Sequence, residues 1–311
     1  MRMTLVTVVG AAVICLCAAD RQQPGTAVDA ADVAFGYIDS TGSKLLILNE
    51  MDKGSPISEA RAKALVGAVC SEGREFPIRY VRYQKGTPAS SGRQGSDNFA
   101  NDQGHVSEIV RGHAPPDDTC LLVPEGYLKT FPIVRNEFSK TDRDRRRDEY
   151  HRRLAVASIH KQVFDLTPFQ ALNEFGKQAV SRIEKEKGRT SKIYWPLYRH
   201  GASQEVAVVE FNAMGDSLLG SLVLVEPTRV SYFDMPASLE KGRKDGGCWR
   251  VDDDCRLQYE DMGVPAVLGA PGGQLVFATF QGAEGQLIVL FQSRDGKLAE
   301  LRQNYRYQAP R

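Results

Sequence analysis

The chain has 311 residues, and its 40 lysines and arginines almost balance its 39 aspartates and glutamates, which leaves a formal net charge of +1. With so little net charge, the chain has no global field that would select nucleic acid or an anionic membrane surface. The length permits one large domain or two ordinary ones, with enough residues to bury a core without a cofactor.

The N-terminus has the pattern of a cleaved secretory signal peptide, which we assign to residues 1–19. Arg2 supplies a short positive region, and the apolar stretch Thr4–Cys17 is too short to span a membrane as a mature helix. The pattern therefore predicts a periplasmic or secreted protein. An alternative is a lipid anchor at Cys17 or Cys15, which would make the chain an outer-membrane lipoprotein. No later stretch has the length of a transmembrane helix.

A polar linker at residues 20–31 leads to a predicted N-terminal α+β region at residues 32–135. Its expected strands are Val33–Asp39, Lys44–Asn49, Phe76–Tyr83, Cys120–Val123 and Phe131–Val134. Apolar residues at helical spacing predict a helix from Ser55 or Ser58 to about Cys70. Residues 84–118 are rich in glycine, serine, asparagine, aspartate and proline, and they predict a long polar loop that is either mobile or functional.

Residues 136–188 form a predicted helical region. Arginines and acids alternate through Asn136–Arg153, which favours a solvated helix, with a polyanion contact around Arg143–Arg153 as the alternative. A second helix begins at Thr167-Pro168-Phe169-Gln170, which has the residues of a capping box, and ends at Gly188. Its apolar stripe is expected to cover one face of a C-terminal sheet.

The C-terminal region, residues 189–311, is predicted to be β-rich. The expected strands are Lys192–Tyr198, Glu205–Phe211, Leu218–Val225, Arg229–Phe233, Gln274–Phe280, Leu287–Phe291 and Leu298–Tyr307. Two of them, Gln274–Phe280 and Leu287–Phe291, are almost wholly apolar, so both of their faces should be buried.

The last strand, Leu298–Tyr307, alternates instead and indicates a half-exposed strand near an edge. One set of alternate residues is Ala299, Leu301, Tyr305 and Tyr307, and the other is Glu300, Arg302, Asn304 and Arg306. Asp295-Gly296 predicts a type I′ hairpin before this strand. The expected fold is α+β: a small N-terminal α+β unit, connecting helices, and an antiparallel meander of about seven strands.

Four cysteines remain after the signal peptide, and an even number in an exported chain favours two disulfides. Nearest pairing predicts Cys70–Cys120 and Cys248–Cys255. The alternatives are the two other connectivities and four free buried thiols. A zinc site is disfavoured because no Cys-x-x-Cys spacing occurs.

Gly215-Asp216-Ser217-Leu218 resembles the block that names the GDSL-type esterases, in which the serine is the nucleophile. The resemblance covers only these four residues. In that family the catalytic histidine follows near the end of the chain, whereas every histidine here precedes Ser217: His105, His113, His151, His160 and His200. A serine needs a base to become a nucleophile, so we interpret Ser217 as a turn residue.

The remaining polar clusters do not have the spacing of a cofactor or metal site. His105 and His113, with Glu108 between them, are interpreted as exposed loop residues rather than metal ligands. Asp252–Asp254 is interpreted as a solvated acidic turn, because an EF-hand spacing is missing. No phosphate-binding loop or basic–aromatic nucleic-acid pattern is present, so no cofactor and no nucleic-acid partner is predicted.

The glycine-rich loop Glu240–Cys255 is the preferred contact surface, with Trp249 as its anchor. The alternative is that Trp249 packs against the sheet. The sequence thus predicts an exported, non-enzymatic envelope or secreted protein that binds another protein or a surface polymer. The alternative function is a secreted hydrolase whose site is assembled from scattered residues, such as His200 with an acid and Ser203 or Ser217.

Overall fold

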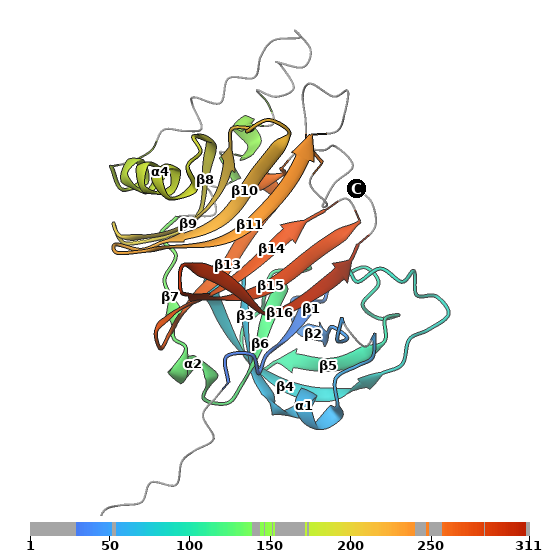
Figure 1. Cartoon of the computed structure of the whole chain (residues 1–311). Coiled ribbons are helices and arrows are strands. Elements are labelled where there is room, and N and C mark those ends of the chain that lie inside the picture. The colour runs from blue at the N-terminus through green and yellow to red at the C-terminus, as the bar shows by residue number, and fades with distance from the viewer. Residues whose placement is uncertain are drawn as a thin grey trace, which may run out of the picture.

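The structure is a computed structural model, which describes residues 29–51, 54–138, 144–145, 147–150, 152, 172, 174–239, 247–248, 257–282 and 284–308. It is mostly β, with 50% strand and 16% helix, and its strands form two barrel-like bodies that lie against each other (Figure 1). The predicted α+β unit followed by a seven-stranded meander is therefore wrong. Within the described ranges, no helix is long and apolar enough to cross a membrane.

The first body is a closed six-stranded barrel with the strand order β1-β2-β5-β4-β3-β6. Its strands are β1 (Ala34–Ile38), β2 (Lys44–Ile47), β3 (Leu65–Cys70), β4 (Arg74–Gln84), β5 (Gly104–Ile109) and β6 (Thr119–Pro124). All six neighbouring pairs are antiparallel. Strands β1, β2, β4 and β6 were predicted. The apolar inward residues of the barrel fill its interior, among them Ile38, Leu45, Ala68 and Leu122.

The predicted helix from Ser58 to Cys70 is correct only at its start. The Ser58 side chain accepts a hydrogen bond from Arg61 N at 3.2 Å and caps α1 (Glu59–Ala64). From Leu65 the chain is strand β3 instead. Val66 and Val69 are β-branched and favour a strand, and Gly67 permits close contact with Val123 of β6.

The predicted loop at residues 84–118 is also corrected, because β5 divides it. Strand β5 pairs with β2 on one side and with β4 on the other, so it is a central strand of the first barrel. Its sequence, Gly104–Ile109, includes the buried polar residues His105 and Ser107. A strand that buries polar side chains has no apolar run by which it could be recognised.

The second body is a ten-stranded sheet that curves into a nearly closed barrel. Its strands are β7 (Ile133–Val134), β8 (Ser191–His200), β9 (Gln204–Phe211), β10 (Ser217–Val225), β11 (Val230–Leu239), β12 (Gly247–Cys248), β13 (Met262–Ala270), β14 (Gly273–Gln281), β15 (Gly285–Arg294) and β16 (Lys297–Tyr307). Strands β8–β11 and β13–β16 form two antiparallel runs, which meet in a parallel contact of β11 with β16 at Tyr232 and Lys297.

The two ends of this sheet approach each other beside β7. Strand β7 pairs with β13, and the chain that follows β7 lies along the end of β8, where Glu137 N donates to Arg199 O at 2.7 Å. The Tyr198 hydroxyl also donates to Val134 O. These contacts convert an open sheet into a nearly closed barrel.

The predictions for the last three strands are confirmed in most respects. Asp295 and Gly296 have φ values of 52° and 73°, as a type I′ hairpin between β15 and β16 requires.

Strands β14 and β15 are buried on both faces. Val276 and Phe291 face the core of the second barrel, whereas Phe277 faces the first barrel and stacks on Phe35 with ring centroids 5.9 Å apart.

Helix α4 (Glu174–Lys187) covers the outer face of β8–β10, as Figure 1 shows. Its buried residues Ala179 and Ile183 pack with Ala207 and Val223 of the sheet, which confirms the predicted cover for one face. The predicted helix start at Thr167–Gln170 lies outside the described residues. The short helical turns are α2 (Tyr127–Thr130), Ser71–Gly73 and Tyr259–Asp261.

Candidate functional site

The predicted disulfide Cys70–Cys120 is present, with an S–S distance of 2.05 Å. It joins the end of β3 to the start of β6 inside the first barrel, where both cysteines are fully buried. The Asp118 carboxyl lies beside it and accepts a hydrogen bond from Ser71 N at 3.0 Å. Burial raises the pKa of Asp118 above its ordinary value, although the bonds from Ser71 oppose the shift.

Several predicted residues cannot be placed. Trp249 and Cys255 lie outside the described residues, so the second disulfide Cys248–Cys255 and the contact role of Trp249 stay predictions. The same is true of the signal peptide with its lipid-anchor alternative, of most of the Arg143–Arg153 segment, and of Asp252–Asp254. The described part of the arginine segment, residues 144–145, 147–150 and 152, is helical, and it buries Tyr150 against Trp195.

Ser217 closes a tight turn and is the first residue of β10, which agrees with the predicted structural role. It exchanges backbone hydrogen bonds with Met214 at 3.0 and 3.1 Å around a tight turn in which Gly215 has a φ of 60°. Its hydroxyl accepts a hydrogen bond from Arg189 Nη2 at 2.9 Å. An arginine donates and cannot remove the serine proton, so this contact does not activate the hydroxyl.

Among the described residues, no histidine lies in a complete catalytic or metal site, although His200 Nδ1 is 3.9 Å from the Glu137 carboxylate. His200 Nδ1 lies 2.9 Å from Arg135 O, and His105 Nε2 lies 2.8 Å from Ile57 O. His105 is 5% exposed within β5, so its predicted loop position is wrong, whereas His113 is exposed. Across the described ranges, the one cluster with metal-ligand spacing is Cys70, Asp118 and Cys120, whose thiols are already joined.

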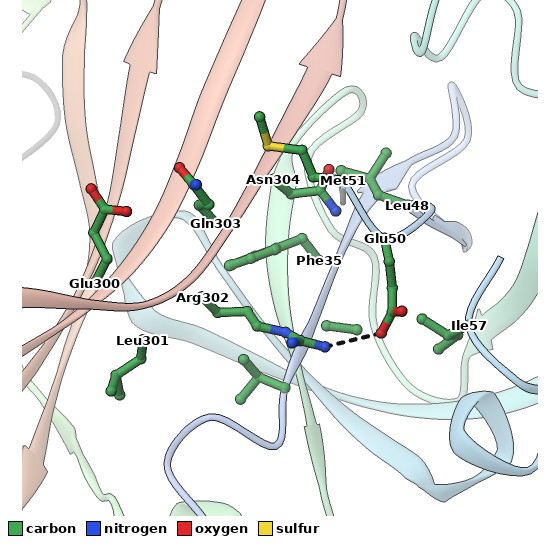
Figure 2. Close-up of a pocket in the computed structure, with 12 residues that line it drawn as sticks. Phe35, Leu48, Glu50, Met51, Ile57, Glu300, Leu301, Arg302, Gln303 and Asn304 are labelled. Carbon is green, nitrogen blue, oxygen red and sulfur yellow. Dashed lines mark hydrogen bonds and ion pairs between the residues drawn. The ribbon is translucent and has the colours of Figure 1, made fainter. Parts of the chain in front are cut away.

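A cavity of about 310 Å³ lies between the two barrels (Figure 2). We call it the inter-barrel cleft. Its first wall is formed by the ends of β1 and β2 and the chain that follows, and its second wall by consecutive residues of β16. Its lining residues are Val33, Ala34, Phe35, Leu48, Glu50, Met51, Ile57, Glu300, Leu301, Arg302, Gln303 and Asn304.

A shared carboxylate links the two walls of the cleft. Glu50 Oε1 accepts from Arg61 Nη1 of α1 at 2.7 Å and from Arg302 Nη2 of β16 at 3.1 Å. Figure 2 shows the Arg302 side chain reaching across to Glu50. Arg302 is 35% exposed, and a guanidinium has five donors in all, so it can also bind an anionic group in the cleft.

The cleft combines this charged pair with an apolar floor. Phe35, Leu48 and Ile57 are buried at its base, whereas Met51 is 49% exposed at the side. The Asn304 amide donates to Asn49 O at 2.8 Å and holds β16 against the first barrel. The surface that the cleft exposes is mostly polar, so hydrogen bonds and charge should contribute much of the recognition of a ligand there.

The two faces of β16 are the reverse of what an apolar–polar alternation suggests. The polar residues Asn304 and Arg306 are buried against the first barrel, whereas Tyr305 and Tyr307 are 38% and 39% exposed. The first barrel supplies polar partners for this face, and the carbonyl of Asp117 accepts from Arg306 at 2.7 Å. Arg302 was not predicted as a site residue, although the partial alternation in this strand indicated a polar face.

A second cavity, of about 250 Å³, opens at one end of the second barrel. Its lining includes the buried residues Trp195, Leu197, Glu260, Met262 and Thr279 and the less buried residues Asp144, Arg147, Asp261, Gly263, Gln281 and Gln286. It is smaller than the inter-barrel cleft, so we take the inter-barrel cleft as the candidate site.

Comparisons of the chain with protein-family models, with curated proteins and with solved structures found no match.

Proposed function

We propose that the protein is an exported binding protein and that the inter-barrel cleft holds a segment of another polypeptide. The observation that carries this proposal is the cleft itself, in which Arg302 of one barrel and an apolar floor from the other face the same space. Strand β16 forms one wall, and the other combines β1 with the chain after β2, where Arg61 and Arg302 hold the Glu50 carboxylate in place before any ligand binds. Such preorganisation lowers the entropy cost of binding.

Export is supported by the disulfide. Cys70–Cys120 is buried within the first barrel, and stable disulfides are typical of oxidising compartments such as the periplasm and the cell exterior. The finding is compatible with the predicted secretory signal, and it favours a partner that is also outside the cytoplasm.

The alternative is a hydrolase built on His200 with an acid and Ser203 or Ser217. Glu137 Oε1 lies 3.9 Å from His200 Nδ1, but no hydrogen bond joins His200 to either serine among the described residues. His200 contacts the carbonyl of Arg135, and Ser217 contacts Arg189. A serine nucleophile requires a base within hydrogen-bond reach. We therefore propose a binding role and not a catalytic one.

Exchange of one cleft charge tests this function. Arg302→Glu places a carboxylate beside Glu50. It removes the guanidinium donors and should repel an acidic polypeptide segment. We expect at least tenfold weaker binding to an immobilised, unfolded, carboxymethylated polypeptide, measured by surface plasmon resonance. Peptidoglycan fragments and a neutral glucan are run in parallel as probes for the surface-polymer alternative.

The matched control is Arg294→Glu on the same β15–β16 hairpin, because its side chain is 78% exposed and lies at the turn. This variant should bind the polypeptide as tightly as the native protein. Equal binding by both variants, or binding of the glycans alone, would contradict a polypeptide-binding cleft.

A further inference from the structure

Among the described residues, strand β16 has an open edge along the inter-barrel cleft. On one side β16 pairs with β15 from Arg294 and Lys297 to Gly285 and Tyr307, with a bulge at Leu301 between the pairs Phe291–Glu300 and Leu290–Arg302. On the other side, within the part of the chain that the structure describes, it pairs with β11 only at Lys297. The residues Glu300–Asn304 that line the cleft lie along this open side.

The backbone groups on the open side can be identified from the end of the strand. Tyr307 exchanges hydrogen bonds with Gln94, through Gln94 N to Tyr307 O at 2.7 Å and Tyr307 N to Gln94 Oε1 at 2.9 Å. These groups therefore point away from β15. Residues two apart on a strand point their backbone groups to the same side, so Gln303 and Tyr305 also point away from β15.

Tyr305 N is satisfied by Asn304 Oδ1 at 2.7 Å. The N–H and C=O of Gln303 and the C=O of Tyr305 lack a backbone partner among the described residues. An unpaired N–H and C=O on one strand edge form a template for another extended chain.

We propose that the polypeptide ligand binds as an added β-strand on β16, with Gln303 as the central pairing residue. This inference rests on the proposed function and specifies its chemistry. The open edge lies between Lys297, which β11 covers, and Tyr307, which Gln94 covers. It therefore accepts a short strand of about six residues, the usual length of a β-strand.

The side chains of the cleft define the sequence that the added strand should have. Arg302 and Asn304 flank Gln303 and face the first barrel, so the ligand residues that flank the one paired with Gln303 also face the cleft floor. An acidic side chain there can bind Arg302. Apolar side chains at the neighbouring cleft-facing positions can contact Phe35, Leu48 and Ile57.

The position of the edge favours a free segment over a second copy of this chain. The wall opposite β16 belongs to the first barrel, and Figure 2 shows Glu50 facing Arg302 across the space. A single extended strand needs about 5 Å beside β16, whereas the edge of a folded sheet brings its own packed layers, which are about 10 Å apart.

The test uses three fluorescently labelled hexapeptides with the sequence Thr-Val-Thr-Glu-Thr-Val. The first is unmodified. The second has N-methyl groups on the threonines, whose amides point toward β16 in the proposed register, and the third has them on the other three residues, whose amides point away. Fluorescence anisotropy should show at least tenfold weaker binding for the second peptide than for the first. The third should bind within about twofold of the first, because its edge-facing donors are intact.

Two variants test the protein side of the same contact. Gln303→Pro removes the N–H on the open edge but no hydrogen bond to β15. It should lower the affinity for the unmodified peptide at least tenfold. Gln303→Ala keeps the N–H and should bind the unmodified peptide at least fivefold more tightly than Gln303→Pro, because only the proline variant loses the backbone donor. Circular dichroism checks that both variants are folded. If the proline variant is unfolded, the binding of the three peptides to the native protein decides whether strand addition occurs.

The outcomes separate strand addition from the broader proposal. Equal binding of all three peptides, or of none, overturns strand addition, whereas the polypeptide-binding function is judged by Arg302→Glu alone. Sedimentation of the protein without peptide tests the remaining occupant. A dimer that Gln303→Pro dissociates would assign the edge to a second copy and would also overturn the proposal.

Discussion

Arg306 is the residue that holds the polar loops of the first barrel against the second. Its side chain is 1% exposed, and its guanidinium donates to Gln94 O at 2.7 Å, Asp117 O at 2.7 Å and Thr119 Oγ1 at 3.1 Å. It also pairs with the Asp117 carboxylate and lies over the Tyr37 ring. Burial lowers the pKa of Arg306, but these acceptors stabilise its charged form.

The same cluster explains why a glycine- and serine-rich segment has a defined shape. The Tyr37 hydroxyl donates to Asp102 Oδ2 at 2.6 Å, and Asn98 donates to Asp102 Oδ1 at 2.5 Å. Burial and the hydrogen bond to Asp102 raise the pKa of Tyr37 far above its ordinary value, so the tyrosine stays a donor. Polar contacts here order residues that have few apolar side chains to bury.

Arg306→Met should therefore destabilise the fold by about 3 kcal/mol, because it removes several charge-assisted hydrogen bonds from a buried position. Urea unfolding followed by circular dichroism measures the change. Arg294→Met is the matched control, since its side chain is 78% exposed, and it should cost less than about 0.5 kcal/mol. Equal stability of the two variants would show that the Arg306 contacts contribute nothing net.

At the scale of the elements, the sequence predicted the strands and turns that depend on neighbouring residues. Strands β14 and β15 were recognisable because both of their faces are apolar, and the β15–β16 turn because Asp295-Gly296 suits positive φ at both positions. Strand β13 was missed because Gly263, Pro265 and Gly269 interrupt its apolar pattern. Helix α1 was extended too far, because the helical spacing continues into residues that pair with β6.

Barrel closure and the candidate site depend on contacts between residues far apart in the chain. The pairing of β1 with β6 and the contact of β11 with β16 have no local signal. The Glu50–Arg302 pair joins residues 252 positions apart. A single sequence showed that Leu298–Tyr307 has a polar face, but it could not show that the first barrel supplies the partners for that face.

The disulfide is the element-scale feature whose energy can be estimated. It joins β3 and β6 across a sequence separation of 50 residues, and the chain-entropy model assigns about 4 kcal/mol to a loop of that length. The double variant Cys70→Ala/Cys120→Ala should lose about that amount in urea unfolding. Alanine is preferred to serine, because both positions are fully buried and a hydroxyl there would need a partner. A loss below about 1 kcal/mol would contradict the estimate.

For the whole molecule, the apolar core that the two barrels share should make their unfolding cooperative. One cluster of buried residues contains Phe35, Tyr37 and Leu121 of the first barrel and Phe277 and Leu290 of the second. Neither barrel could open without exposing this apolar surface to water, which costs about 25 cal/mol for each Å². The inter-barrel cleft is therefore held by two bodies that should unfold as one cooperative unit.

The last prediction tests this coupling. The chain has two tryptophans, so Trp249→Phe leaves Trp195, which is buried in the second barrel, as the reporter of that barrel. In this background, Cys70→Ala/Cys120→Ala weakens only the first barrel directly. If the barrels are coupled, the urea midpoint from Trp195 fluorescence should fall together with the midpoint from circular dichroism. With independent barrels, the Trp195 midpoint would stay at its original value while part of the circular dichroism signal changed at lower urea. That result would mean that the shared core does not couple them, and that the cleft can open without loss of the second barrel.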